Sequence, residues 1–476
     1  MKFRFHHIAP LDNAEIELGD LTIIAGRNNT GKTYLAYALY GLLKLWRAWP
    51  VERHSDMEIS HPDWSAVDPP DAGHAINWSS LAEAVKTEGR AAVRVTPDAL
   101  VAHRRLLWTL LARDFVRDQL PTVFQVKPEE FGDARVEVVD DRPLSEATCR
   151  LEFVPGSKLV VSYNDELLEI SGRRGDGSAL RPHPWLRGVL LRAYTRFLLA
   201  HLPSPFVLTG ERLGIALFYR ELDFTRNQLV ELLQDRHRRS GSEDPDMPFL
   251  VIDKAASRYA LPIKDNITYT RSLPDRNGSS GDLSRQGLLP GLGALVDGDF
   301  TASEGELRYR SRKGASPAFD IPLHRASSSA RALMDFDFYL RHDAHKGQLL
   351  IVDEPESHLD VDNQVALARL IARITANGVR VLVTTHSDYF LKEINNLIMA
   401  AGLAPSNQIR SELGYGGKAG VRPSRVRAYL AEDGTLRRCE VDRYGIEIPL
   451  FERAVQRIND RSRRLASALY EEERDG

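Results

Sequence analysis

Residues 21–33 read LTIIAGRNNTGKT, and this stretch decides the fold. It opens with a short continuous apolar run, LTIIAG, which is typical of a strand buried on both faces. A glycine-containing loop follows and leads into TYLAYALYGLLKLWRAW, in which apolar residues recur at helical spacing. The sequence therefore predicts a buried strand, a tight loop and an amphipathic helix in direct succession.

The loop fits the pattern G-x-x-x-x-G-K-[ST] between a strand and a helix, which is the context that a phosphate-binding loop requires. Inward-pointing backbone N–H groups and the positive end of the helix would hold phosphate oxygens. Lys32 is expected to reach the β- and γ-phosphates, and the Thr33 hydroxyl to bind Mg²⁺. The predicted nucleotide-binding residues are Gly26, Arg27, Asn28, Asn29, Thr30, Gly31, Lys32 and Thr33. The alternative is an ordinary strand-to-helix turn with a surface lysine.

A second apolar run, LLIV at 349–352, ends in the adjacent carboxylates Asp353 and Glu354. A buried strand that ends in two acids is costly unless a cation or a reaction uses them. Asp353 is therefore predicted to hold Mg²⁺, directly or through water. Glu354 is predicted to act as the general base on the attacking water. The alternative is a strand whose aspartate caps the next helix.

His386 follows a third apolar strand, VRVLVTT. A lone histidine is usually structural. Here, however, a helix expected at 361–376 separates it from the acidic strand, which makes a strand–helix–strand unit. Parallel strands in such a unit end at the same edge of the sheet, where ligands bind. The predicted catalytic residues are thus Glu354, His386 and Lys32.

The composition is that of an ordinary globular protein of 476 residues, of which 43% are hydrophobic. The 63 basic and 66 acidic residues give a net charge of −3, so nucleic acid could be bound only through a local patch. Cys149 and Cys439 are too few for a disulfide framework and favour a cytoplasmic location. We expect neither a signal peptide nor a membrane span.

Together these segments resemble the head of ABC-type ATPases, in the branch that holds RecF, the SMC proteins and the OLD ATPases and that includes stand-alone bacterial AAA-family ATPases. GRNNTGKT fits the branch's form of the phosphate loop, LLIVDEPESHLD its acidic strand and D-loop, and TTHSDYFLKEINNL its switch-histidine segment. TGERLGIALFYREL resembles a further E-R-x-G-I segment. The resemblance implies an α/β P-loop head with a mixed sheet, split by an inserted α+β region, that acts on ATP with Mg²⁺.

The long separation between the phosphate loop and the acidic strand requires inserted structure. Alternating runs between 134 and 172 predict an antiparallel meander within it. The predicted parts are the first head segment at 1–48, the α+β insert at 49–204, a helical arm or lid at 205–320, the second head segment at 321–400, and a C-terminal hairpin and helix at 401–476. The chain lacks sustained heptads, which argues against a chromosome-tethering rod.

One segment departs from the resemblance. In the family, an L-S-G-G-[QE] signature closes on the ATP of the other protomer, whereas residues 326–331 here read ASSSAR. Ser327, Ser328 and Ser329 precede a helix, so their hydroxyls and the helix-end N–H groups could still bind phosphate; simple N-capping is the alternative. The resemblance implies a homodimer or higher homo-oligomer through an ATP sandwich. Glu211 and Arg212 stand where a polar pair near the nucleotide is expected, and structural pairing is an equal alternative.

Family analogy favours an ATPase that dimerises on ATP and controls a separate effector, a nuclease or toxin, in bacterial anti-phage defence. A RecF-like repair ATPase that clamps DNA is the alternative, and a scaffold that uses ATP only as a clamp is a third. Four basic clusters could serve DNA: Arg104–Arg105, Arg173–Arg174, Arg236–Arg239 and Arg461–Arg464.

No nuclease domain and no membrane partner are expected. Glu432 and Asp433 are adjacent acids late in the chain, but the surrounding LAEDGTL is typical of a hairpin turn. They lack the separate glutamate and D-x-D strand of a TOPRIM nuclease. We therefore predict that the chain hydrolyses ATP without cutting nucleic acid.

Overall fold

The computed structural model describes residues 1–48, 76–140, 147–154, 157–174, 186–219, 259–276, 288–303, 305–312, 319–416, 420–448 and 450–475. The chain forms two compact units. Unit 1 comprises Met1–Ile8, Glu15–Glu17 and Ala38–Ser204, and unit 2 comprises Ala9–Ala14, Leu18–Tyr37 and Pro205–Gly476.

Unit 2 is built on a mixed sheet in the strand order β16-β15-β3-β14-β13-β9. Its strands are β3 (Leu21–Gly26), β9 (Pro205–Leu208), β13 (Leu349–Asp353), β14 (Arg380–Thr385), β15 (Val426–Glu432) and β16 (Thr435–Cys439). The five strands from β15 to β9 run parallel, whereas β16 runs antiparallel to β15. The predicted α/β fold with a mixed sheet is confirmed.

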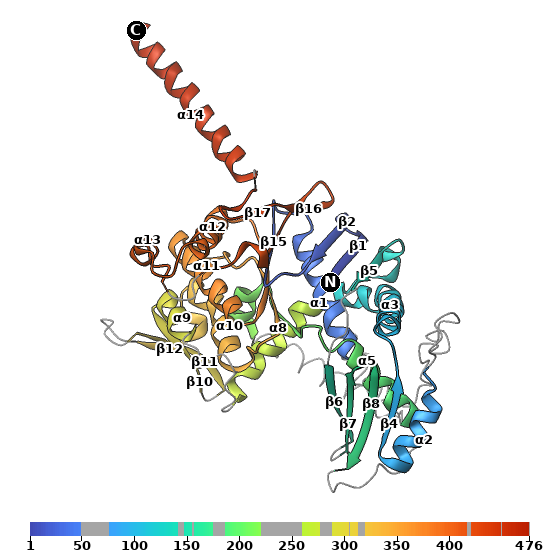
Figure 1. The fold of residues 1–476 in the computed structure, drawn as a ribbon. Coiled ribbons are helices and arrows are strands. Elements are labelled where there is room, and N and C mark those ends of the chain that lie inside the picture. Colours follow the sequence, from blue (N-terminus) through green and yellow to red (C-terminus); the bar gives the residue numbers. More distant parts are fainter. Residues whose placement is uncertain are drawn as a thin grey trace, which may run out of the picture. The chain divides into compact units, whose positions relative to one another are not determined.

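Burial explains why the central strands read as continuous apolar runs. Every residue of β3 and β13 is buried, and so is every residue of β14 after the first. Parallel strands of this kind need cover on both faces, which helices supply. The helices that flank the site strands in sequence are α1 (Lys32–Ala48), α10 (Ser328–His342), α11 (Val361–Ala376) and α12 (Asp388–Gly402) (Figure 1).

The region predicted as a helical arm, 205–320, contains strands as well as helices. Its described elements are β9, α8 (Leu261–Ser272), α9 (Leu288–Val296), β10 (Gly298–Ser303), β11 (Glu306–Ser311) and the start of β12 (Asp320–Pro322). The last three form an antiparallel sheet of their own. The physical reason is the alternation in β11, which buries Leu307 and Tyr309 and leaves Arg308 and Arg310 more exposed.

The predicted C-terminal hairpin is formed by β15 and β16, with Asp433 in the turn. It is not a separate appendage, because β15 pairs with β3 in the centre of the sheet. Four consecutive residues, 428–431, are buried, which requires a position inside the sheet with both faces covered. The elements that follow are β17 (Val441–Asp442), β18 (Gly445–Ile446) and the helix α14 (Leu450–Asp475); α13 (Gln408–Glu412) precedes them.

Unit 1 contains a four-stranded antiparallel sheet in the order β4-β8-β7-β6, and α2 and α5 contact it (Figure 1). Its described elements are β1 (Lys2–Ile8), α2 (Trp78–Glu88), β4 (Arg90–Arg94), α3 (Pro97–Asp114), α4 (Leu120–Phe124), β5 (Arg135–Val139), β6 (Ala147–Val154), β7 (Ser157–Asn164), β8 (Leu167–Arg174) and α5 (Leu186–Leu198); β2 (Leu11–Glu17) has residues in both units.

The predicted meander is correct for β6, β7 and β8 and wrong for residues 134–139. That run is β5, and it pairs antiparallel with β1 instead. The pairing places Val136 opposite Phe5, both buried. Across the described residues of both units, no helix combines the length and apolarity that a membrane crossing demands.

Asp335 on α10 is a buried carboxyl in unit 2. It accepts hydrogen bonds from Thr270 Oγ1 at 3.3 Å and Asn266 Nδ2 at 3.2 Å. Burial disfavours the charged form and raises the pKa of Asp335 to about 7. The folded chain therefore keeps a proton that the unfolded chain releases near pH 4.

We predict that the contribution of Asp335 to stability falls as pH rises from 4 to above 7. One proton of difference gives a slope of at most about 1.4 kcal/mol per pH unit. Asp335→Asn removes this proton uptake, so the variant should gain stability relative to the parent as pH rises. Urea midpoints of both proteins at pH 5 and pH 8 check the prediction, and a pH-independent difference between them would contradict it.

Candidate phosphate-binding and hydrolytic site

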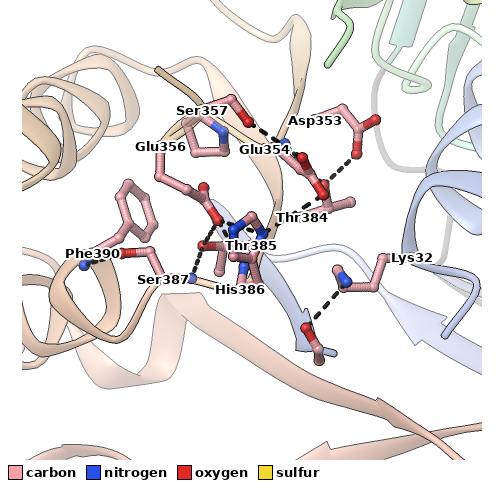
Figure 2. Close-up of polar contacts among 12 residues, drawn as sticks. Lys32, Asp353, Glu354, Glu356, Ser357, Thr384, Thr385, His386, Ser387 and Phe390 are labelled. Atoms are coloured by element: carbon pink, nitrogen blue, oxygen red, sulfur yellow. Dashed lines mark hydrogen bonds and ion pairs between the residues drawn. The ribbon is translucent and has the colours of Figure 1, made fainter. Parts of the chain in front are cut away.

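The candidate site lies in unit 2, at the edge of the sheet where β3, β13 and β14 end. Gly26 is the last residue of β3, Asp353 is the last residue of β13, and His386 follows β14 directly. β14 pairs in parallel with both other strands, so their carboxyl ends meet at one edge. The fold thus brings the three sequence segments together, as Figure 2 shows for Lys32, Asp353 and His386.

Two glycines give the loop its shape. Gly31 has a φ of +87°, in the left-handed region, and a Cβ there would lie 2.6 Å from Cγ of Leu11. A Cβ at Gly26 would lie 2.6 Å from the carbonyl oxygen of Ala431 on β15. Any larger residue at either position would therefore collide with its surroundings, which accounts for both glycines of the motif.

Lys32 begins α1 and folds its side chain back over the loop. Its Nζ donates hydrogen bonds to the carbonyls of Gly26 at 3.1 Å and Arg27 at 2.6 Å. Burial lowers the pKa of Lys32, and the nearby carboxylates, Glu354 first among them, oppose that effect. The ammonium group is therefore held inside the loop, where an anion would meet it.

Thr33 and Asp353 form a pair of oxygen ligands. Thr33 Oγ1 lies 3.1 Å from each carboxylate oxygen of Asp353, and Thr384 Oγ1 also donates to that carboxylate. Burial raises the pKa of Asp353 to about 6. A hydroxyl beside a carboxylate fits Mg²⁺, which binds through one or two such groups together with phosphate oxygens and water. Among the described residues, no three His, Cys, Asp or Glu side chains gather into a fuller metal site.

Glu354 adopts a left-handed backbone with a φ of +46°. Its N–H donates to the carbonyl of Thr384 at 3.1 Å and lies 3.1 Å from Thr384 Oγ1. Such a conformation costs of the order of 1–3 kcal/mol in a residue other than glycine, and strained residues of this kind cluster at active sites. The turn takes Glu354 out of the strand alternation, so its side chain need not point to the face opposite Asp353.

The Glu354 carboxylate is partly exposed and has two polar neighbours. Ser357 Oγ donates to Oε2 at 3.2 Å, and Nδ1 of His386 lies 3.6 Å from Oε1. The proximity of His386 to this carboxylate is the main reason that the pKa of Glu354 is lowered and that of His386 raised. Glu354 is therefore an ionised carboxylate beside a polarised imidazole.

Arg212 fastens the end of the acidic strand. It is 1% exposed, and its guanidinium donates to the carbonyls of five residues: Thr209 (3.1 Å), Ala332 (3.0 Å), Asp353 (2.9 Å), Glu354 (2.9 Å) and Pro355 (3.2 Å). These bonds join β9, α10 and the turn after β13. Structural pairing, one of the two alternatives, thus describes Arg212. Its neighbour Glu211 accepts a hydrogen bond from Tyr37 OH on α1 at 3.1 Å.

The three serines stand at the start of α10. Ser327 is the N-cap, and its Oγ accepts from the N–H of Ala330 at 3.2 Å and lies 3.1 Å from Ser329 Oγ. Ser328 is exposed. Within the described part of the chain, no hydrogen bond links these serines to the phosphate loop or to the acidic pair. Within one chain, Ser327 therefore acts as the N-cap of α10.

The basic clusters give little support to a DNA surface. Arg104 is 1% exposed and lies 3.6 Å from Asp140, so it cannot contact DNA, and that part of the prediction is wrong. The cluster at 461–464 is exposed on α14. The cluster at 236–239 and the side chains at 173–174 lie outside the described residues.

Sequence reasoning missed one residue at this edge, Glu356. It is 4% exposed, and its carboxylate contacts the backbone and ring of His386. The available signal was a third acid within DEPE, two residues after Glu354.

Comparison with known proteins agrees with this geometry over part of the chain. Residues 192–392 match the family described as "AAA domain, putative AbiEii toxin, Type IV TA system". The matched stretch includes Arg212, the acidic strand and His386. No curated protein matches.

Among solved structures, three SMC heads are similar. One, from Pyrococcus furiosus, has an extended coiled coil and is bound to the C-terminal domain of ScpA (12% identity, 96% of this chain and 98% of that chain covered, TM-score 0.32). A second is an SMC head bound to the C-winged helix domain of ScpA (12% identity, 92% of this chain and 95% of that chain covered, TM-score 0.29). Another is the SMC head domain from Thermotoga maritima (11% identity, 93% of this chain and 98% of that chain covered, TM-score 0.29). The family match and the site geometry together support a nucleotide-hydrolysing ATPase of the AAA and P-loop type.

We predict that Arg212→Ala destabilises unit 2 by about 3–5 kcal/mol, because it removes a buried guanidinium that donates to the carbonyls of five residues. Arg437→Ala is the control, since Arg437 makes an exposed ion pair with Glu432 at 2.9 Å, worth about 1 kcal/mol or less. Urea unfolding of both variants measures the difference. Equal, small losses would show that Arg212 does not fasten the acidic strand.

Proposed function

We propose that this chain binds ATP with Mg²⁺ at residues 26–33 and hydrolyses it with Glu354 as general base. The proposal rests on one observation: Lys32, the Thr33–Asp353 pair and Glu354 lie at one edge of the sheet. Thr33 of the phosphate loop and Asp353 of the acidic strand are 320 residues apart in the sequence.

In this proposal each group has one task. The loop N–H groups and Lys32 bind the phosphates, and Lys32 exchanges the carbonyls of Gly26 and Arg27 for phosphate oxygens. Thr33 and Asp353 hold Mg²⁺, which supplies charge neutralisation at the β- and γ-phosphate oxygens. Glu354 takes a proton from the attacking water, and its lowered pKa keeps it ionised for this purpose. His386 lies beside Glu354 and would contact the γ-phosphate or that water.

ATP is also proposed to join two copies of the chain. Ser327–Ser329 would then close on the nucleotide of the partner, with the exposed Ser328 and the free N–H groups at the start of α10 as phosphate donors. Binding would close the dimer and hydrolysis would open it.

The biological role proposed is control of a separate effector in bacterial anti-phage defence. The support is the family match, whose description names a toxin and a toxin–antitoxin system. ATP-driven closure would hold or release the effector. Copurification with the product of the neighbouring gene tests this role.

We predict that Glu354→Gln lowers the rate of ATP hydrolysis about 100-fold or more, because general-base catalysis is lost, and leaves ATP affinity nearly unchanged. Lys32→Ala should instead abolish ATP binding. Phosphate release and binding of a fluorescent ATP analogue measure the two effects. Glu83→Gln is the control, as Glu83 is an exposed residue of α2 that pairs with Lys86. Normal hydrolysis by Glu354→Gln would refute the assignment of the base.

A further prediction concerns the dimer. In the Glu354→Gln background, ATP should produce a dimer in light scattering, and Ser328→Arg should prevent it while ATP binding persists. Ser424→Arg, a like change at an exposed position before β15, is the control. If Ser328→Arg still forms ATP-dependent dimers, Ser327–Ser329 do not bind the partner's nucleotide.

A further inference from the structure

Glu356 is a buried carboxylate for which the proposed hydrolysis has no use. It lies in the turn between β13 and α11 and is 4% exposed. Burying a carboxylate is costly unless hydrogen bonds compensate it, so its partners should reveal what it stabilises.

The contacts of Glu356 converge on the two residues around the end of β14. Its Oε1 accepts a hydrogen bond from Thr385 Oγ1 at 2.8 Å and another from the N–H of His386 at 2.7 Å. Nδ1 of the His386 ring lies 3.2 Å from the same oxygen. The second oxygen, Oε2, is buried and accepts no hydrogen bond within the described residues. Figure 2 shows the Glu356 carboxylate directed at Thr385 and His386.

Two carboxylates therefore compete for one ring nitrogen. Nδ1 of His386 lies 3.2 Å from Glu356 and 3.6 Å from Glu354. The ring nitrogen that faces an acceptor carries the proton, in the neutral as in the charged imidazole. Glu356 is nearer to Nδ1, and its hydrogen bond with the backbone N–H of His386 holds the backbone from which the ring projects. Without this carboxylate, Glu354 would be the remaining acid within reach of Nδ1.

We propose that Glu356 is a positioning residue: it fixes His386, keeps a proton on Nδ1, and so leaves the Glu354 carboxylate available to the attacking water. The proposal rests on the hydrolysis proposed above. The arrangement resembles the support that a second carboxylate gives to a working histidine by setting its orientation and tautomer.

Glu356→Gln is the direct test, because the amide oxygen can still accept the bonds from Thr385 and from the His386 backbone. We expect ATP affinity to stay within about twofold and kcat to fall about tenfold. In the ¹⁵N spectrum of the His386 ring, the parent should carry its proton on Nδ1, and the Nδ1 resonance of the variant should shift, because the Nδ1–H turns from residue 356 towards the Glu354 carboxylate. Glu356→Asp, which keeps the charge, should retain more activity than Glu356→Gln.

The matched control is Glu393→Gln, because Glu393 is an equally buried carboxylate of unit 2 that pairs with Arg369 at 2.6 Å. It should lower stability without moving kcat or the His386 spectrum. Parental kcat and spectrum in Glu356→Gln would overturn the proposal, and so would a parent whose Nδ1 carries no proton, even if the variant failed to fold. A parent that binds but never hydrolyses ATP would refute the proposed function alone, since the nitrogen spectrum would still decide where the proton lies.

Discussion

The parallel pairing of β3, β14 and β13 is the constraint on which the rest of unit 2 depends. It forces three segments that are remote in sequence to end at one edge. The edge then collects charge that a protein interior cannot hold without compensation, namely the Lys32 ammonium group and the carboxylates of Asp353 and Glu356, all buried. Most of the polar structure around the site exists to satisfy these groups.

Neighbouring backbone, guanidinium and hydroxyl groups stabilise these buried charges and the turn that carries them. Arg212 holds the carbonyls of the turn after β13, and Thr384 holds the Asp353 carboxylate and the N–H of Glu354. These bonds stabilise the left-handed conformation of Glu354, which by itself is unfavourable. The proposed base is thus held in place, and it would need little reorganisation when a substrate arrives. The same bonds join α10, which begins at the serines, to the acidic strand through Ala332.

Much of this edge could be predicted from the sequence, because its signals are local. The apolar runs predicted β3, β13 and β14, the loop pattern predicted the turn at Gly26–Thr33, and N-capping by serine before α10 was one of the two alternatives weighed. The pairing of β5 with β1 and of β15 with β3 could not be predicted, because alternation shows that a strand exists and not which strand it joins. Arg212 and Glu356 were missed or left open for a related reason. Their importance lies in contacts with residues far along the chain, and no local pattern records those.

We propose above all that ATP and Mg²⁺ bind at the edge where β3, β13 and β14 end, with Glu354 facing the terminal phosphate. A structure of the protein with Mg²⁺ and a non-hydrolysable ATP analogue tests it most directly. We expect the metal about 2.1 Å from the Thr33 hydroxyl oxygen, the γ-phosphate beside Lys32, and a water between that phosphate and Glu354. A nucleotide bound elsewhere, or a γ-phosphate out of reach of Glu354, would contradict the account.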